Sequence, residues 1–382
     1  MTGNRVRELQ VLHLRHQLSE PIQTTMGPVR ARPALLIRLE DDQGAHGWGE
    51  VWCNFPPGGD FYRAELAANV LPAALADMHL DDAEPSRHIE RKLHRLTLQA
   101  GEPGPIRQLA AAVDIAVHDL RARRKGIPLA VELGGELRPV PAYASGISAA
   151  LHESQVLRMR ALGFRHFKQR IGYGKDDGLP QLQACAAGLE ADERLMADAN
   201  QAWDLTAALQ HSQLLDSLSL AWLEEPLPAD AGAADWHTLA RQMSTPLAGG
   251  ENLRDDDSFI SAIKAGDLHI LQPDICKWGG LSGGHRIATL ALANGRRYCP
   301  HYLGGGIGLL ASAHLLSAVG GDGLLEVDSS DNPLQLTLAG GRIALDNERF
   351  HIPSGPGLGI EPDITGLSAL LVSDVKRSVQ PS

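Results

Sequence analysis

The first third of the chain changes from a strand-like to a helix-like pattern of hydrophobic and polar positions. Three stretches rich in alternating or continuous apolar residues, Arg5 to Leu18, Ala34 to Glu40 and His46 to Trp52, predict a β-meander. From Phe61 onward apolar residues recur at intervals of three and four, which indicates helices. An antiparallel sheet followed by helices predicts an α+β domain over residues 1–125.

After this domain a repeating unit takes over, in which a short apolar run ending in a polar residue precedes a helical stretch. Eight such runs are found at residues 140–145, 164–170, 195–200, 220–225, 246–251, 268–274, 297–301 and 324–327. Strands that alternate with helices favour a parallel α/β barrel, which we place at residues 126–345. The remaining segment, 346–382, is rich in turn residues, and we expect it to pack back on the first domain.

Composition narrows the class of protein. The 382 residues include 46 acidic and 35 basic side chains, and the net charge of −11 argues against general nucleic-acid binding. Four scattered cysteines without a C-x-x-C pair argue against a disulfide scaffold or a structural zinc site. Neither a signal core nor an apolar run of about 18 residues is present. We expect a soluble, cytoplasmic homo-oligomer without a membrane or nucleic-acid partner.

Each of seven consecutive runs carries an ionisable side chain at its last position or within two residues before it. These residues are 23 to 30 positions apart, about one βα unit, and they are Lys168, Asp198, Glu224, Glu251, Asp274, His301 and Glu326. A strand-end acid often only caps the following helix. The ordered set indicates more than capping, because the carboxyl ends of parallel barrel strands meet at one mouth, where active sites of this architecture lie.

Three carboxylates from adjacent predicted strands, Asp198, Glu224 and Glu251, predict a metal site. Packed together without a cation they would repel one another and raise one another's pKa values. An all-oxygen ligand set, with no Cys or His among the three, favours Mg²⁺ over Zn²⁺. We therefore expect Mg²⁺ as the cofactor.

The groups beside the predicted metal site suggest acid–base chemistry on an anion. A hydrogen bond from His301 to Asp274 would fix the imidazole tautomer and leave the other ring nitrogen free as a base. Lys168 and Arg170 fall on one face of their strand, since strand side chains repeat every two residues. Two cations near a metal describe a site for a small-molecule carboxylate.

This set of motifs resembles the mandelate racemase subgroup of the enolase superfamily, and the resemblance covers nearly the whole chain. The matching residues, in order, are Gly47-Trp48-Gly49-Glu50, Gly134-Gly135, Lys168-x-Arg170, Asp198-x-Asn200, Glu224-Glu225-Pro226, Gly250-Glu251-Asn252, Pro273-Asp274, His301, Glu326 and Pro356-Gly357-Leu358-Gly359. The resemblance implies an α+β capping domain over a modified (β/α)7β TIM barrel. It also implies Mg²⁺-dependent abstraction of the proton α to a carboxylate, through an enediolate intermediate.

The resemblance further assigns roles to individual residues. Glu326, if protonated, would donate a hydrogen bond to the substrate carboxylate. Asn200 and Glu225 would orient the metal ligands or bind substrate. Where many members carry a second lysine, this chain has Arg170, a poor proton acceptor and a good anion anchor unless its pKa is unusually perturbed. His301 then becomes the favoured base.

A single base favours elimination over racemisation, so we expect a lyase that dehydrates a sugar acid, an aldonate or aldarate, to a 2-keto-3-deoxy acid. Racemisation or epimerisation by an isomerase, and cycloisomerisation, remain alternatives. A non-catalytic homologue that only binds metal is a more remote one.

Substrate specificity is expected to come from loops of the first domain. The segment Ser19 to Pro33 has the small and turn residues of a mobile lid, and Arg30 or Arg32 in it could clamp the distal carboxylate of a diacid or simply be solvated. Residues 52–59 form a second predicted loop over the mouth. The glycine-rich run after His301 lacks the features of a P-loop or a dinucleotide fingerprint, so we expect no nucleotide there.

Overall fold

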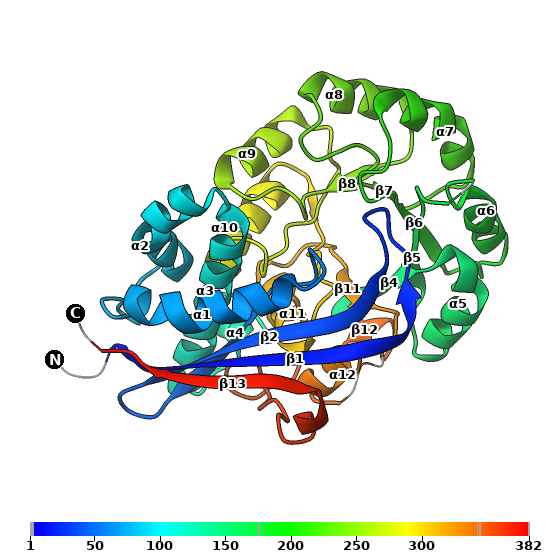
Figure 1. Ribbon diagram of the computed structural model, residues 1–382. Coiled ribbons are helices and arrows are strands. Elements are labelled where there is room, and N and C mark those ends of the chain that lie inside the picture. Colours follow the sequence, from blue (N-terminus) through cyan, green and yellow to red (C-terminus); the bar gives the residue numbers. More distant parts are fainter. Residues whose placement is uncertain (1–3, 175, 342, 344, 381–382) are drawn as a thin grey trace.

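Two β-sheets organise the protein, one in a capping domain and one in a barrel (Figure 1). The computed structural model describes residues 4–174, 176–341, 343 and 345–380 of the chain. Within these residues no helix is both long and apolar enough to cross a bilayer. The architecture is α/β with an N-terminal capping domain, which confirms the fold class predicted from the sequence.

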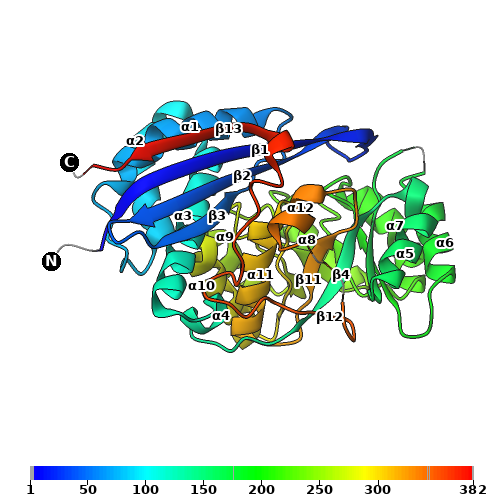
Figure 2. The same cartoon turned by 90° about the horizontal axis from the view of Figure 1, so that it is seen from below.

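The capping domain is built on a four-stranded antiparallel sheet. Its strands follow the order β13-β1-β2-β3, with bounds Leu371–Ser378, Val6–Ile22, Val29–Asp41 and His46–Val51. Both faces of β2 are buried: Leu35 and Ile37 join the core of the capping domain, while Leu36 joins the core shared with the barrel. Burial on both faces explains why β2 is almost continuously apolar in sequence. Figure 2 shows this sheet between helix α1 (Gly59–Leu75) and the barrel.

Helix α3 (Pro103–Lys125) holds the sheet in place, and α2 (Pro85–Ala100), which the sequence did not single out, packs beside it. Strand β3 approaches α3 closely through the two glycines of the Gly47-Trp48-Gly49-Glu50 motif. A Cβ on Gly49 would lie 1.9 Å from the carbonyl oxygen of Ala112, and one on Gly47 would lie 2.1 Å from that of Ala116. These glycines are therefore required by the close approach of the strand to the helix.

Eight parallel strands form the curled sheet of the barrel. Their order is β10-β9-β8-β7-β6-β5-β4-β11, and in chain order they are Val140–Ile147, His166–Arg170, Arg194–Asp198, Leu223–Glu224, Leu247–Gly249, Ile270–Leu271, Arg297–Tyr298 and Leu325–Asp328. The seven α-helices between them, α5 to α11, are His152–Ala161, Leu179–Ala187, Leu205–Ser217, Ala233–Gln242, Asp256–Ala265, Gly280–Ala293 and Gly306–Val319. Figure 1 shows several of these helices covering the outside of the curved sheet. This alternation is the predicted (β/α)7β pattern.

Short elements complete the chain. They are α4 (Leu129–Glu132), the 3₁₀ turns Ala149–Leu151 and Ser368–Leu370, α12 (Pro333–Leu338) and β12 (Arg349–Phe350). The C-terminal segment touches both parts of the molecule, because β12 pairs with β4 of the barrel and β13 pairs with β1 of the capping domain.

The inside of the barrel has an apolar layer beneath a polar one. The apolar layer is a separate cluster of one side chain from most strands or strand edges: Tyr143, Met196, Trp222, Ala248, Ile270, Cys299 and Leu324. Two residues further along the chain stand Asp198, Glu224, His301 and Glu326, which therefore point to the same side of the sheet, one step nearer the mouth. The alternation of side chains along each strand therefore places a packed apolar layer beneath a layer of polar side chains at the barrel mouth.

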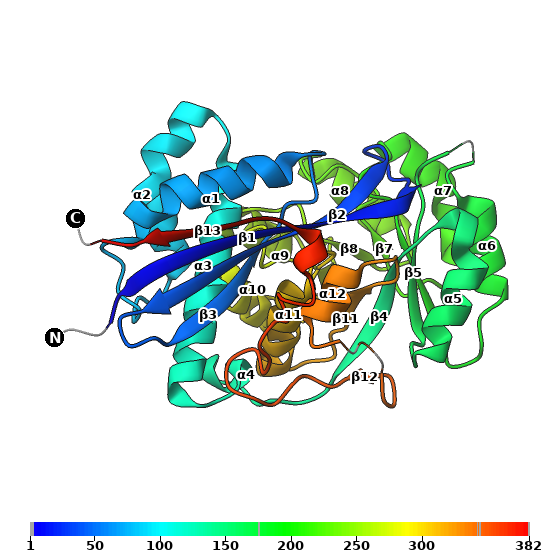
Figure 3. The ribbon, with the colours of Figure 1, turned by 60° about the horizontal axis from the view of Figure 1, so that its bottom comes forward.

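The capping domain reaches over the barrel mouth by a long β-hairpin. Strand β1 continues to Ile22 and β2 begins at Val29, so most of the segment expected to be a lid is hairpin strand rather than loop. Figure 3 shows the hairpin extending towards β5 and β7. At its tip, the Thr25 hydroxyl donates to the Asn200 carbonyl over 3.1 Å. The tip is therefore tied directly to the end of a barrel strand.

Candidate active site

A cavity of about 620 Å³ lies between the capping domain and the barrel mouth. Its lining includes Met26, Arg32, Trp52, Asn54 and Arg63 from the capping domain and Arg170, Asp198, Asn200, Glu251, Lys277 and His301 from the barrel. Both loops predicted to cover the mouth contribute to this lining. The structure thus brings most of the predicted site residues to one place.

Of the three predicted metal ligands, Asp198 and Glu224 end β6 and β7, and Glu251 follows β8; the charge of Glu251 raises the pKa of both other carboxyl groups. Burial raises the pKa of Asp198, and it raises the pKa of Glu224 to about 7 despite the nearby Lys168. Burial would also raise the pKa of Glu251, but the charges of His301 and Lys277 hold it well below its ordinary value. Three buried carboxylates are costly to keep ionised without cations.

Two lysines supply positive charge to these carboxylates. Nζ of Lys168 lies 2.6 Å from Oε2 of Glu224, and Nζ of Lys277 lies 2.5 Å from Oε2 of Glu251. Among the described residues the His, Cys, Asp and Glu side chains do not form a ready-made cluster of three metal ligands. In this arrangement the ammonium groups of Lys168 and Lys277 pair with the carboxylates of Glu224 and Glu251.

The donor set nevertheless fits Mg²⁺. Oε1 of Glu224 is buried and accepts no hydrogen bond from the described residues, which leaves a hard oxygen available in a polar site. Asn200 holds the neighbouring Asp198 through its backbone N–H (2.8 Å) and its side-chain amide (3.1 Å). Carboxylate oxygens fixed in this way are the ligands that Mg²⁺ prefers.

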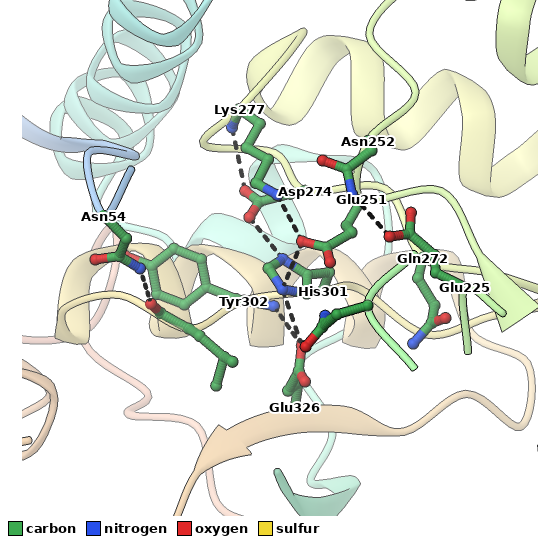
Figure 4. A network of polar contacts seen from close by, with 12 residues as sticks. Asn54, Glu225, Glu251, Asn252, Gln272, Asp274, Lys277, His301, Tyr302 and Glu326 are labelled. Carbon is green, nitrogen blue, oxygen red and sulfur yellow. Dashed lines mark hydrogen bonds and ion pairs between the residues drawn. The ribbon is translucent and has the colours of Figure 1, made fainter. Parts of the chain in front are cut away.

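His301 and Asp274 form the expected pair (Figure 4). Nδ1 of His301 donates to Oδ2 of Asp274 over 2.8 Å, while Oδ1 of Asp274 accepts from the backbone N–H groups of Cys276 and Lys277. Asp274 is therefore fixed, and it fixes the tautomer of the imidazole. Nε2 of His301 faces Oε2 of Glu251 at 3.0 Å.

The charge state of His301 is set by its neighbours. Burial lowers its pKa, but the charges of Glu251 and Glu326 outweigh burial and raise it to about 9. Cancelling the charge of Glu251 would remove the largest opposing effect and favour the neutral, basic imidazole.

Glu326 is an ion-pair partner here. It lies 2.8 Å from Nζ of Lys168 and accepts from the backbone N–H of Tyr302 at 2.8 Å. Burial raises its pKa, yet Lys168 and His301 lower it to about 2. The ion pair with Lys168 and the low pKa favour the carboxylate form of Glu326 over the protonated donor implied by the family resemblance.

The arginines predicted at the barrel mouth differ in whether they line the cavity. Arg170 and Arg32 both line it, and Arg32 forms a 2.8 Å ion pair with Asp328 at the end of β11. Arg30, two residues before Arg32 on β2, is exposed and does not line the cavity. Of the two candidate clamps, only Arg32 reaches the site.

Glu225 lies behind the metal ligands. Its Oε2 accepts from the side-chain amide of Asn252 at 2.7 Å, and burial raises its pKa well above the ordinary value. Glu225 and Asn200 both have positive φ angles, 36° and 42°, immediately after or near strand ends. Backbone strain of this kind is found where side chains must be aimed into a site.

Two functional candidates were missed in the sequence. Gln272 donates to Oε2 of Glu224 over 2.7 Å, and it stands two residues before Asp274, so the period of two could have indicated it. Lys277 lies beyond its strand in a turn, where no periodicity applies. Its Nζ also lies 4.6 Å from the ring centroid of Trp52, which joins the capping-domain loop to the barrel.

Two family models match the chain. The model described as "Mandelate racemase / muconate lactonizing enzyme, N-terminal domain" matches residues 6–134, and the model "Enolase C-terminal domain-like" matches residues 152–365. Together they span the capping domain and the barrel.

Related enzymes are isomerases and lyases. The D-galactarolactone cycloisomerase of Agrobacterium fabrum is 30% identical over 377 residues, which cover 94% of this chain and 97% of the relative. The L-talarate/galactarate dehydratase of Salmonella typhimurium is 29% identical over 329 residues, covering 83% and 79%.

Solved structures of related enzymes show the same family resemblance. A mandelate racemase/muconate lactonizing enzyme from Bordetella bronchiseptica has a TM-score of 0.88 and 43% identity, covering 97% of this chain and 100% of that chain. A racemase from Streptomyces coelicolor with bound magnesium has a TM-score of 0.84 and 26% identity, covering 96% and 100%. Use of Mg²⁺ is general among such enzymes.

Proposed function

The chain belongs to the mandelate racemase and muconate lactonizing enzyme family of the enolase superfamily, and from this premise we propose that it is a Mg²⁺-dependent sugar-acid dehydratase. The observation that carries the proposal is the asymmetry of the site: a fixed His301–Asp274 pair on one side and, in place of a second base, Arg170 on another. The substrate is an aldonate or aldarate, and the product is a 2-keto-3-deoxy acid.

Asp198, Glu224 and Glu251 would hold the metal. When bound, Mg²⁺ supplies positive charge beside the substrate carboxylate and so lowers the free-energy cost of removing the weakly acidic proton at C2. Lys168, buried beneath the metal ligands, holds a second positive charge near the same place.

His301 performs the proton transfers. Its Nε2 accepts the C2 proton, and the C–H electron pair moves into the carboxylate to give an enediolate. That pair then forms the C2–C3 double bond as the C3–O bond breaks, and the hydroxyl leaves as water with the proton that His301 held. The enol gains a proton at C3 and loses one from its C2 hydroxyl, which yields the keto acid. Proton transfer by a positioned group of this kind accelerates reactions about 10²- to 10⁴-fold.

Arg170 supports elimination rather than racemisation. A two-base racemase needs a proton acceptor on each face of the substrate carbon, and a guanidinium stays protonated near neutrality. Arg170 lies at the end of β5, next to Asp198 on β6. There it can bind an anion or hydroxyl but does not return a proton to the opposite face.

Cycloisomerisation is a second candidate, favoured by the relative of Agrobacterium fabrum that bears this activity in its name. A cycloisomerisation that begins with the same proton abstraction keeps every atom of the substrate. The two reactions therefore differ in product mass by one water.

The test is a screen of aldonates and aldarates with Mg²⁺ in deuterated water. Release of water with formation of a 2-keto acid supports the dehydratase. A product of unchanged mass with a ring opened or closed supports the cycloisomerase, and exchange at C2 with inversion supports an epimerase. The absence of both turnover and C2 exchange for all tested acids contradicts the proposal.

A further inference from the structure

Two motifs noted in the sequence, the Gly47-Trp48-Gly49-Glu50 run and the glycine-rich run after His301, meet between the capping domain and the barrel. Glu50, on β3, is 2% exposed. Its Oε1 accepts the backbone N–H of Gly305 at 2.6 Å, and its Oε2 accepts that of Gly308 at 2.9 Å. These N–H groups lie at the beginning of α11, where they have no partner within the helix. Glu50 therefore fixes the start of the helix that follows the candidate base.

The segment 302–305, which joins His301 to α11, is also held along its length. The side-chain amide of Asn54, from the capping domain, donates to the Leu303 carbonyl over 2.5 Å (Figure 4). The ring of Tyr302 packs against two glycines of the run, at positions where a Cβ atom would overlap with it. A short, tightly packed segment transmits displacement from one end to the other. The place of α11 and the place of His301 are therefore linked.

The same stretch of the capping domain contacts the turn behind Asp274. The backbone N–H of Trp52 donates to the Cys276 carbonyl over 3.4 Å. The N–H of Cys276 in turn donates to Oδ1 of Asp274 at 2.8 Å, while Oδ2 of Asp274 accepts from Nδ1 of His301 at 2.8 Å. Residues 50–54 thus contact the supports of both members of the Asp274–His301 pair.

A carboxylate is a costly side chain to place at this domain contact. Burial raises the pKa of Glu50, and the hydrogen bonds from Gly305 and Gly308 offset only part of this effect. An apolar side chain would fill a domain interface without the cost of burying a carboxylate. What the carboxylate adds is direction, because two hydrogen bonds to two backbone groups fix the orientation of the chain that carries them.

We propose that Glu50 is a positioning residue of the candidate active site: it fixes the start of α11 and the segment before it, so that docking of the capping domain sets the place of the His301 imidazole against Asp274. This inference rests on the proposed function, in which His301 transfers the proton. Glu50 is not among the residues that line the cavity, so it acts through His301 and not on the substrate. Misplacing a reacting group by about 1 Å can slow a reaction about 10²-fold.

Two substitutions remove the contacts of Glu50 in steps. Glu50→Gln keeps one acceptor oxygen and turns an NH₂ group towards the second backbone N–H, whereas Glu50→Leu removes both acceptors. With Mg²⁺ and an accepted acid, we expect the rate of C2 proton exchange to fall about tenfold in Glu50→Gln and about 100-fold in Glu50→Leu, with KM changed by less than about threefold. If Glu50→Leu does not fold, Glu50→Gln alone decides.

The Nδ1–H proton of His301 reports on the position of the imidazole without any substrate. A hydrogen bond to the Asp274 carboxylate moves its NMR signal downfield and protects it from exchange with water. The signal is assigned by its absence in His301→Asn. In both Glu50 variants we expect it to shift and to exchange with water about tenfold faster or more.

Glu361→Gln is the matched control. Glu361 also accepts hydrogen bonds beside β3, from the indole N–H of Trp48 at 3.0 Å and from Nη1 of Arg123 at 2.8 Å, but it belongs to the C-terminal segment and does not line the cavity. This substitution should loosen the capping domain while leaving the His301 signal unchanged. Thermal melting of each variant measures how far the fold is destabilised.

An unchanged His301 signal in the folded Glu50 variants overturns the proposal. So does an equal change in Glu361→Gln, because it would trace the effect to the general stability of the capping domain. The inference and the proposed function fail separately: a His301 signal that responds to Glu50, in a protein without C2 exchange on any acid, would leave the positioning role and remove the dehydratase. Full C2 exchange in Glu50→Gln would leave the chemistry and remove the positioning role.

Discussion

Nζ of Lys277 lies 2.5 Å from Oε2 of Glu251, the carboxylate that follows β8 and that we propose as a metal ligand. Figure 4 shows Lys277 and His301 both close to this side chain. An ammonium and a divalent cation compete for the same oxygen, so metal affinity and the stability of the site are linked through Lys277.

Replacing Lys277 with Met should therefore strengthen Mg²⁺ binding and weaken the protein in a chelator. We expect Mg²⁺ to bind severalfold more tightly, because the competing cation is gone. In EDTA the buried Glu251 keeps His301 as its remaining ion-pair partner among the described residues, and unfolding should become easier by about 2 kcal/mol. Calorimetric titration and thermal melting with and without Mg²⁺ measure both effects. Lys92→Met, at an exposed ion pair, is the control, and weaker Mg²⁺ binding by Lys277→Met than by the control would contradict the competition.

Removing the charge of Arg170, which makes no hydrogen bond or close ion pair with the described residues, should stabilise the protein. Arg170→Met replaces a buried guanidinium that has no partner among the described residues with an apolar side chain of similar length. We expect the free energy of unfolding to rise by about 1–2 kcal/mol, measured by urea unfolding without ligand. A clear loss of stability would show that the guanidinium is already satisfied.

Arg170→Lys tests the role of the arginine as a non-base. A lysine at this position places a titratable amine on the face opposite His301, as in the many family members that carry one there. We expect a new C2 exchange with inversion of configuration, followed by proton NMR in deuterated water, at the expense of elimination. If wild-type protein already inverts C2 at the same rate, Arg170 or another group is a competent second base.

Acid sensitivity of the fold should come in part from His314 on α11. This side chain is buried, and its Nδ1 accepts the backbone N–H of Ala130 at 3.2 Å; burial lowers its pKa to about 4. In the unfolded chain the His314 imidazole takes up a proton near pH 6.5. The contribution of the buried, neutral imidazole to the free energy of unfolding is therefore complete above that pH. It is lost as the pH falls from about 6.5 towards 4, by up to about 3 kcal/mol.

His314→Asn keeps a hydrogen-bond acceptor and removes the titration. The variant should be less stable than wild type at pH 7.5 but should lose less stability between pH 7 and pH 4.5, as measured by urea unfolding at each pH. Parallel pH profiles for the two proteins would show that His314 does not titrate differently on folding.

The barrel and its mouth were predictable because period and spacing encode them. One side chain per βα unit, two residues beyond an apolar position, identifies the inner face of each strand, and this was enough to bring Asp198, Glu224 and His301 together. The capping sheet was predictable for a similar reason, although β2 is apolar on both faces because it is buried on both.

What the sequence did not contain are the pairings between side chains outside that period. Lys277 lies in a turn, and nothing local shows that its amine meets Glu251. Arg170 stood out in the sequence because it replaces the second lysine of the family motif, but the sequence does not show that it lines the cavity next to Asp198. The hairpin was taken for a loop because its turn residues, Gly27 and Pro28, occupy the centre of a segment whose strands are half exposed.

The central claim is that His301 removes the proton α to the substrate carboxylate. The most direct measurement follows C2 deuterium incorporation and 2-keto acid formation for an accepted aldarate, with Mg²⁺, in wild type, His301→Asn and Asp274→Asn. We predict that His301→Asn lowers both rates at least about 10³-fold, that Asp274→Asn lowers them less, and that EDTA abolishes both. Undiminished exchange in His301→Asn, with the substrate still bound, would contradict the account.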